Sequence, residues 1–156
     1  MLRKLLTTAG VGALVAMAIG GVSFASASGG ENGGRTVVVI EKTTSQHVLD
    51  LGKPGPTPGD TLFLASQFWN TAQTHQVGSL HAHCVIESKS VLHCIGTGRL
   101  FHGTLEFAGE TTFTGSNSTF AITGGTGEFD GAEGHVSVHS LNSEGTLSRD
   151  TIVLLG

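Results

Sequence analysis

The sequence has 156 residues, with 8 basic and 12 acidic side chains, so its formal net charge at neutral pH is −4. Beyond the first residues no run of Lys or Arg occurs, which excludes the charge pattern of proteins that bind nucleic acid or anionic membranes. We therefore expect no nucleic acid partner and, once the N-terminal segment is removed, no membrane partner.

Residues 1–27 have the three parts of a secretory signal peptide. Arg3 and Lys4 form a basic start, residues 5–24 an apolar stretch, and Ala-Ser-Ala at 25–27 a small-residue cleavage site. A membrane anchor is the alternative, but Gly, Thr and Ser dilute the apolar stretch. The sequence predicts a secreted, extracellular protein that begins at Ser28 and has a net charge of about −6 without Arg3 and Lys4.

The rest of the sequence divides into a leader and one domain. Residues 28–34 are polar and glycine-rich, which predicts a flexible leader. Residues 35–156 are enough for a single domain with one core. Short β-branched or alternating segments recur along it with turn residues between them, and none has a helical period. We expect strands at 36–40, 47–51, 61–69, 75–86, 91–100, 101–108, 119–123, 135–141 and 146–155.

Two connections in this first half are informative. A Thr-Thr-Ser turn is expected between the first two strands, and residues 53–60 hold all three prolines, which predicts an extended loop. The strand at 61–69 is apolar on both faces, so we expect its outer face to be covered by a second subunit in a homodimer or homotrimer. Its two faces carry Leu62, Leu64 and Phe68, and Phe63, Ala65 and Trp69.

Cys84 and Cys94 define the register of the hairpin between residues 75 and 100. A turn centred on Lys89 places the two cysteines directly opposite each other. In an oxidising compartment such a pair closes as a disulfide, which is favoured over two free thiols and over a metal site, since the sequence has no CxxC pair.

Eight histidines are many for this length and raise the question of a metal site. His81, His83 and His93 share one face of the hairpin, and His83 and His93 are diagonal neighbours within reach of one zinc or copper ion. The opposite face is the apolar one, so we expect the histidines to lie outside as solvated imidazoles and predict no metal and no cofactor.

Glu41 is the candidate catalytic residue. It shares the alternation of Val37 and Val39, so its carboxyl could project into a barrel mouth, where burial would raise its pKa and make it a usable acid or base. The alternative is that Glu41 simply ends the strand in water.

The sequence Phe-Ala-Ile-Thr-Gly-Gly-Thr-Gly-Glu-Phe-Asp-Gly-Ala-Glu-Gly at 120–134 joins a strand to a glycine-dense turn. It is not a phosphate-binding loop, because the GxGxxG spacing fails and strand-like sequence follows. The segment resembles the signature of allene oxide cyclase-like and dirigent-like β-barrel proteins, an aliphatic strand followed by G-G-[ST]-G-x-F. The matching glycines are Gly124, Gly125, Gly127 and Gly134.

This resemblance implies an all-β fold, a single antiparallel eight-stranded, calycin-like barrel with a ligand cavity, here in a secreted bacterial member. Allene oxide cyclase-like enzymes use a glutamate on the first strand, and Glu41 is the nearest match. Dirigent-like relatives favour a Phe-Arg-Phe-Ala-Arg-Gly type sequence after the glycine motif. In this chain the segment from Glu128 to Gly134 has acids and glycine in place of those arginines, and the chain has no Tyr, which argues against phenoxy-type substrates.

Two functions remain open from the sequence. The protein is an isomerase or cyclase that orients an apolar small-molecule substrate in its barrel, or a non-catalytic extracellular module that binds a small hydrophobic ligand.

Overall fold

The computed structural model describes residues 25–26, 34–113 and 116–156. Most of the predicted signal peptide, and the predicted leader up to Gly33, lie outside the described residues. Within the described part, no helix has the length and apolar character that a membrane span requires.

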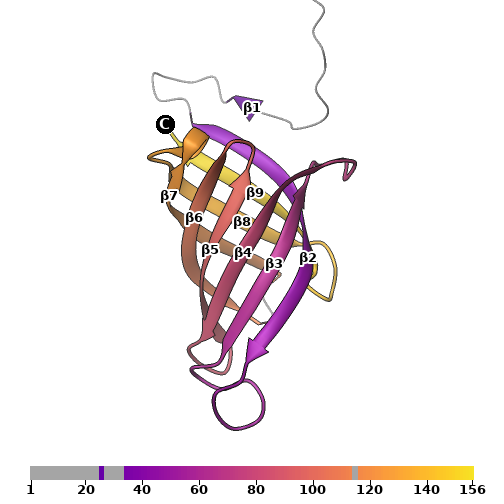
Figure 1. Ribbon diagram of the computed structural model, residues 1–156, viewed down its shortest axis with the longest axis vertical. Helices are drawn as coiled ribbons and strands as arrows, with labels where there is room; N and C mark the ends of the chain where they lie inside the picture. The colour runs from indigo at the N-terminus through magenta and orange to yellow at the C-terminus, as the bar shows by residue number, and fades with distance from the viewer. Residues whose placement is uncertain (1–24, 27–33, 114–115) are drawn as a thin grey trace, which may run out of the picture.

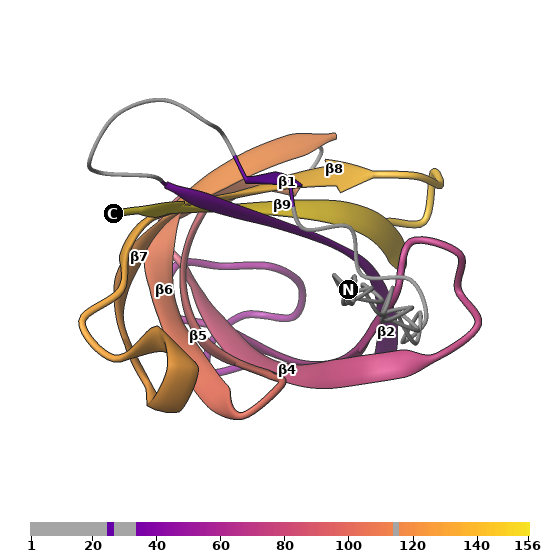
Figure 2. The same ribbon diagram turned by 90° about the horizontal axis from the view of Figure 1, so that it is seen from above.

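The chain folds as a sheet in which every strand is antiparallel to the next, and the ring closes where β2 pairs with β9 (Figures 1 and 2). The predicted eight-stranded antiparallel barrel, formed by β2 to β9, is confirmed. The elements are β1 (Ala25–Ser26), β2 (Arg35–Leu49), β3 (Thr61–Trp69), β4 (Gln76–Ile86), β5 (Val91–Leu100), β6 (Gly103–Thr112), β7 (Asn117–Thr126), a one-turn 3₁₀ helix η1 (Gly127–Phe129), β8 (Glu133–Ser140) and β9 (Leu147–Leu155).

One predicted turn is wrong. Residues 47–51 were expected to form a second strand after a Thr-Thr-Ser turn, but β2 runs through this segment to Leu49. Thr43 and Ser45 pair with the consecutive residues Ser66 and Ala65, so Thr44 is an extra residue in a β-bulge. The Thr44 hydroxyl donates to the Ala65 carbonyl at 2.9 Å. A bulge keeps these β-branched residues in the sheet and bends the strand around the barrel.

The barrel interior is filled most completely at the end that carries η1, the upper end in Figure 1. Val37 and Val39 are fully buried there, and Phe129 in η1 is 2% exposed. The Arg35 guanidinium lies 5.4 Å from the centre of the Phe129 ring. This packing closes one end of the barrel.

The other end carries the proline-containing loop between β2 and β3, as predicted without helix. Asp60 anchors this loop: its carboxylate accepts from the backbone N–H of Leu51 at 2.8 Å and of Thr57 at 2.7 Å. These two backbone donors, that of Leu51 foremost, hold the pKa of Asp60 below its usual value. The Asp60 carboxylate is therefore charged at neutral pH, and its hydrogen bonds to the loop are lost only in strong acid.

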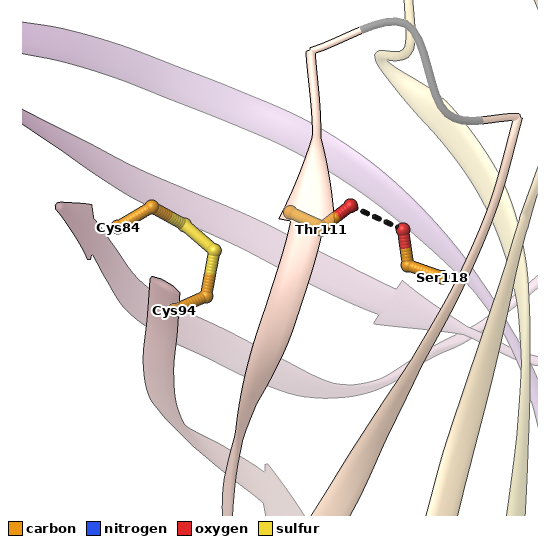
Figure 3. Close-up of a disulfide and its surroundings, with 4 residues drawn as sticks. All are labelled: Cys84, Cys94, Thr111 and Ser118. Atoms are coloured by element: carbon orange, nitrogen blue, oxygen red, sulfur yellow. Dashed lines mark hydrogen bonds between the residues drawn. A yellow bond between two sulfur atoms is a disulfide. The ribbon is translucent and has the colours of Figure 1, made fainter. Parts of the chain in front are cut away.

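The predicted disulfide between Cys84 and Cys94 is present, with Cys84 directly opposite Cys94 (Figure 3). Both cysteines face the barrel interior and are 3% exposed. The bridge encloses a sequence separation of only 10 residues, for which the chain-entropy model gives a stabilisation of about 2.5 to 3 kcal/mol. The disulfide thus fixes the β4–β5 hairpin as part of the inner wall.

Candidate ligand cavity

A cavity of about 380 Å³ lies inside the barrel. This volume is in the range of small-molecule sites. Its walls are largely apolar because alternate residues of each strand point inward. The wall includes the Cys84–Cys94 disulfide and three phenylalanines, Phe68, Phe107 and Phe120. The rings of Phe107 and Phe120 are 5.6 Å apart.

The cavity reaches solvent at the end opposite η1. Its rim there includes Thr112 and Phe113 at the end of β6, and Glu144 in the loop before β9, all of them exposed. Deeper on the same side, the hydroxyls of Thr111 and Ser118 are hydrogen-bonded to each other across β6 and β7 (Figure 3). The cavity is therefore a pocket with one mouth.

One wall of this pocket is polar, where β2 and β9 pair to close the barrel. Glu41 in β2 lies opposite Ser148 in β9, and Asp150 follows two residues along the same inward face. The Ser148 hydroxyl donates to the Asp150 carboxyl at 2.8 Å and lies 3.5 Å from the Glu41 carboxyl. Two carboxyl groups and one hydroxyl thus form a compact acidic site in an otherwise apolar cavity.

The two carboxyls differ in their surroundings. Asp150 is 3% exposed, whereas Glu41 is half-buried. Burial raises the pKa of Asp150 well above its usual value, and the nearby Glu41 carboxyl raises it further, while the Ser148 hydrogen bond opposes this shift. Asp150 therefore keeps its proton at pH values where an ordinary aspartate has lost it.

No protein-family model matches the sequence, and no curated protein matches it. Solved structures share its fold. A pyocyanin demethylase is 25% identical, with a TM-score of 0.68 over 76% of this chain and 98% of that chain. A Diels–Alderase from Streptomyces koyangensis is 20% identical, with a TM-score of 0.62 over 76% of this chain and 63% of its own. A pterocarpan synthase dirigent protein is 13% identical, with a TM-score of 0.62 over 83% and 87% of the two chains.

The chain has the allene oxide cyclase/dirigent-like barrel fold. In this dirigent-like barrel, the glycine segment that carried the resemblance forms the end of β7, the η1 turn and the start of β8. Gly127 adopts a φ of +64°, and a side chain there would strike the His102 carbonyl oxygen. The segment thus needs glycine to place Phe129 in the closed end of the barrel.

Of the candidate site residues, Glu41 lies on the cavity wall, as its alternation with Val37 and Val39 indicated. Its acid–base role stays a prediction. Asp150 and Ser148 were missed, although a signal was present: both share the alternation of Ile152 and Leu154, so the strand at the end of the sequence carries two polar residues on its apolar face.

The histidines of the β4–β5 hairpin lie on the outer surface of the dirigent-like barrel. His81 and His83 line a second hollow there, which is more open to solvent than the cavity, and the His83 ring lies 6.2 Å from that of Phe63. Among the described residues, no group of three or more His, Cys, Asp or Glu side chains is arranged to hold a metal ion. The histidines therefore do not contribute to the barrel cavity.

Replacing Asp150 by asparagine is expected to stabilise the barrel at neutral pH. The unfolded chain loses this proton as the pH rises past 3.8, while the folded state retains it, so the wild-type free energy of unfolding falls between pH 3.8 and the raised folded pKa. Asparagine does not ionise and still accepts from Ser148. We expect a gain of about 0.5 to 2 kcal/mol at pH 7, typical of one stabilising substitution.

Urea unfolding at pH 4 and pH 7 measures this gain, which should shrink toward pH 4. The control is Asp130→Asn, which changes an exposed carboxyl in the turn before β8. Equal effects of the two substitutions at pH 7 would contradict the role given to burial at Asp150.

Proposed function

We propose that this protein binds a mostly apolar small molecule in the barrel cavity and acts on it as an isomerase or cyclase, with Glu41 and Asp150 as the acid–base pair. The observation that carries this proposal is the Glu41–Ser148–Asp150 site on the wall of an apolar pocket with one mouth.

Isomerisation and cyclisation fit this arrangement chemically. Such reactions need a reactive conformer held in place, and fixing reacting atoms can supply on the order of 7 to 11 kcal/mol of the barrier. The apolar walls exclude water from the bound molecule. A protonated Asp150 can donate to a substrate oxygen or nitrogen, while Glu41 can accept a proton, so one site offers both functions.

The named activities of the solved structures support this class of function. They are a demethylase, a Diels–Alderase and a dirigent protein named as a pterocarpan synthase, each acting on or forming small organic molecules. Since the Diels–Alderase and the dirigent protein are at most 20% identical to this chain, their substrates are not transferred.

A non-catalytic function is the second candidate: the barrel would bind a small hydrophobic ligand outside the cell. The disulfide in the cavity wall favours an oxidising compartment, and a signal peptide is predicted. Export would separate the protein from an unstable intracellular intermediate. Export itself is tested by the N-terminal sequence of the secreted chain, which should begin at Ser28.

We also propose that a second copy covers the outer face of β3 in a homodimer or homotrimer. Phe63 is 44% exposed on this face, the adjacent strand β4 adds Val85 at 38%, and β5 beyond it adds Ile95 at 42%. Large apolar side chains grouped in this way are typical of an interface. Light scattering that returns one chain mass at micromolar concentration would reject this assembly.

The experiment separates binding from catalysis. The neutral fluorescent probe N-phenyl-1-naphthylamine should bind the wild-type barrel with 1:1 saturation, and Val138→Trp, which fills the cavity, should abolish binding. Ala121→Trp on the outer face of β7 is the matched control and should leave binding intact. Unchanged binding in Val138→Trp would place the probe elsewhere and reject the cavity as the site.

Catalysis is then tested with a panel of polyenes and enones screened for rearrangement by mass spectrometry. For any substrate that is converted, Glu41→Gln should lower kcat by roughly 10² to 10⁴, the usual contribution of acid–base catalysis, while probe binding is kept. If Glu41→Gln leaves turnover of every converted substrate unchanged, the role of Glu41 is wrong. Binding without conversion of any compound favours the second candidate.

A further inference from the structure

We infer that the barrel cavity selects apolar ligands that carry a basic or cationic nitrogen, held by Glu41, Asp150 and the phenylalanine walls. This inference rests on the proposed binding function and names its ligand class.

The first argument is charge. The ionisable residues that line the cavity are Glu41 and Asp150 on the wall and Glu144 at the mouth. No Lys, Arg or His is among the described residues that line it. The strands next to the acidic pair, β3 and β8, also present no titratable side chain to this space. The interior therefore favours a positive group and repels carboxylates, sulfates and phosphates.

The second argument is the hydrogen-bond inventory of the acidic site. Ser148 has one hydroxyl proton, and its shorter bond, 2.8 Å, goes to Asp150. The Glu41 carboxyl has the long Ser148 contact of 3.5 Å and a side-chain hydrogen bond with Asp150. A carboxylate has about four acceptor sites, so Glu41, which lines the cavity, keeps acceptor capacity that a ligand N–H group would satisfy.

An independent observation is the Ser66 hydroxyl on β3. Ser66 is 3% exposed, and within the described structure its hydroxyl has no hydrogen-bond partner. It lies on the same face of β3 as Leu64 and Phe68, both of which line the cavity, and it pairs with Thr43, two residues along β2 from Glu41. Ser66 does not itself line the cavity, so its hydroxyl lies in the wall behind these residues. A buried hydroxyl without a partner is costly, and a polar ligand group that reached it between Leu64 and Phe68 would relieve this cost.

The aromatic walls add a third contribution. Phe68 lies directly opposite Glu41 across β2 and β3, and Phe107 and Phe120 form a ring pair on the facing wall. The negative faces of aromatic rings attract cations, with about 2 kcal/mol or more when the site is desolvated. A carboxyl pair combined with aromatic rings distinguishes an ammonium from a neutral group of the same size.

Three ligands with the same hydrocarbon cage test this inference: 1-aminoadamantane, 1-adamantanol and adamantane-1-carboxylate. Isothermal titration calorimetry at pH 7 on the wild-type protein should give an affinity for the amine at least ten-fold above that for the alcohol, with the carboxylate weakest. The amine should displace N-phenyl-1-naphthylamine, and Val138→Trp should abolish its binding. The preference for the amine should fall as the pH is lowered and the carboxyl pair gains protons.

The double variant Glu41→Gln/Asp150→Asn should lose the preference, so that its affinity for the amine falls to that for the alcohol. Glu110→Gln, an exposed carboxyl on β6, is the control and should retain the preference. Equal or tighter binding of the alcohol to the wild-type protein overturns the inference while leaving the cavity function intact. The inference is also overturned if none of the three adamantane ligands binds although N-phenyl-1-naphthylamine does. If N-phenyl-1-naphthylamine does not bind either, the proposed function itself is rejected.

Discussion

Gly134→Ala is expected to destabilise the barrel by about 3 to 5 kcal/mol. This is a large part of the free energy of unfolding of a typical domain, which is about 5 to 15 kcal/mol. Gly134 has a φ of +145°, and an added Cβ would lie 1.9 Å from the backbone oxygen of Val153. Because β8 is paired with β7 and β9 at this point, neither neighbour can move away without breaking its own pairing. Urea and thermal unfolding measure the loss.

Gly124→Ala is the matched control, since Gly124 has a φ of +158° but no atom within 4 Å of the added Cβ. It should cost only about 1 to 2 kcal/mol, from backbone strain alone. Similar losses for the two variants would mean that the contact with the Val153 carbonyl is not the cause.

Phe129→Ala should cost a similar amount, about 3 to 5 kcal/mol, because it removes a buried aromatic side chain from the closed end of the barrel. Phe129 is 2% exposed and belongs to the main core cluster. The rigid strand ends around it limit collapse into the space. The same substitution should extend the ligand cavity toward η1, so larger apolar probes should gain affinity relative to the naphthylamine.

Phe113→Ala provides the comparison for stability, since Phe113 is 46% exposed at the cavity mouth. Its truncation should change the free energy of unfolding by less than about 1 kcal/mol. An effect of Phe129→Ala as small as that of Phe113→Ala would contradict the view that η1 seals the barrel.

Features set by local alternation were predictable from the sequence. The strands β3 and β5 have the predicted bounds, and the register of the Cys84–Cys94 hairpin followed from its turn. The bulge at Thr44 was not predictable, because the same β-branched residues suit a turn edge and a strand, and only pairing with β3 decides between them. Closure of the sheet into a barrel was predicted from the family resemblance alone, since periodicity does not report which strands pair.

Only the β2 side of the candidate site, with Glu41, was identified from the sequence. Glu41 extends an inward run of valines, so its direction was readable from β2 alone. Asp150 shares the inward face of β9 with Ile152 and Leu154, but its raised pKa comes from burial in the closed barrel and from Glu41, which is more than one hundred residues away in the chain. Such long-range electrostatic coupling has no local sequence pattern.

The pairing of β2 with β9 also determines the order in which this molecule acquires its structure. Arg35 lies beside Leu154, so the seam of the barrel joins the first and last strands of the ring. Contacts between distant residues form late because closing a long loop costs entropy, whereas the β4–β5 hairpin with its disulfide needs only its own residues. The cavity wall with Glu41 and Asp150 is built at this seam. In a nascent chain the hairpins therefore need only residues that have already been made, whereas the site needs the last strand.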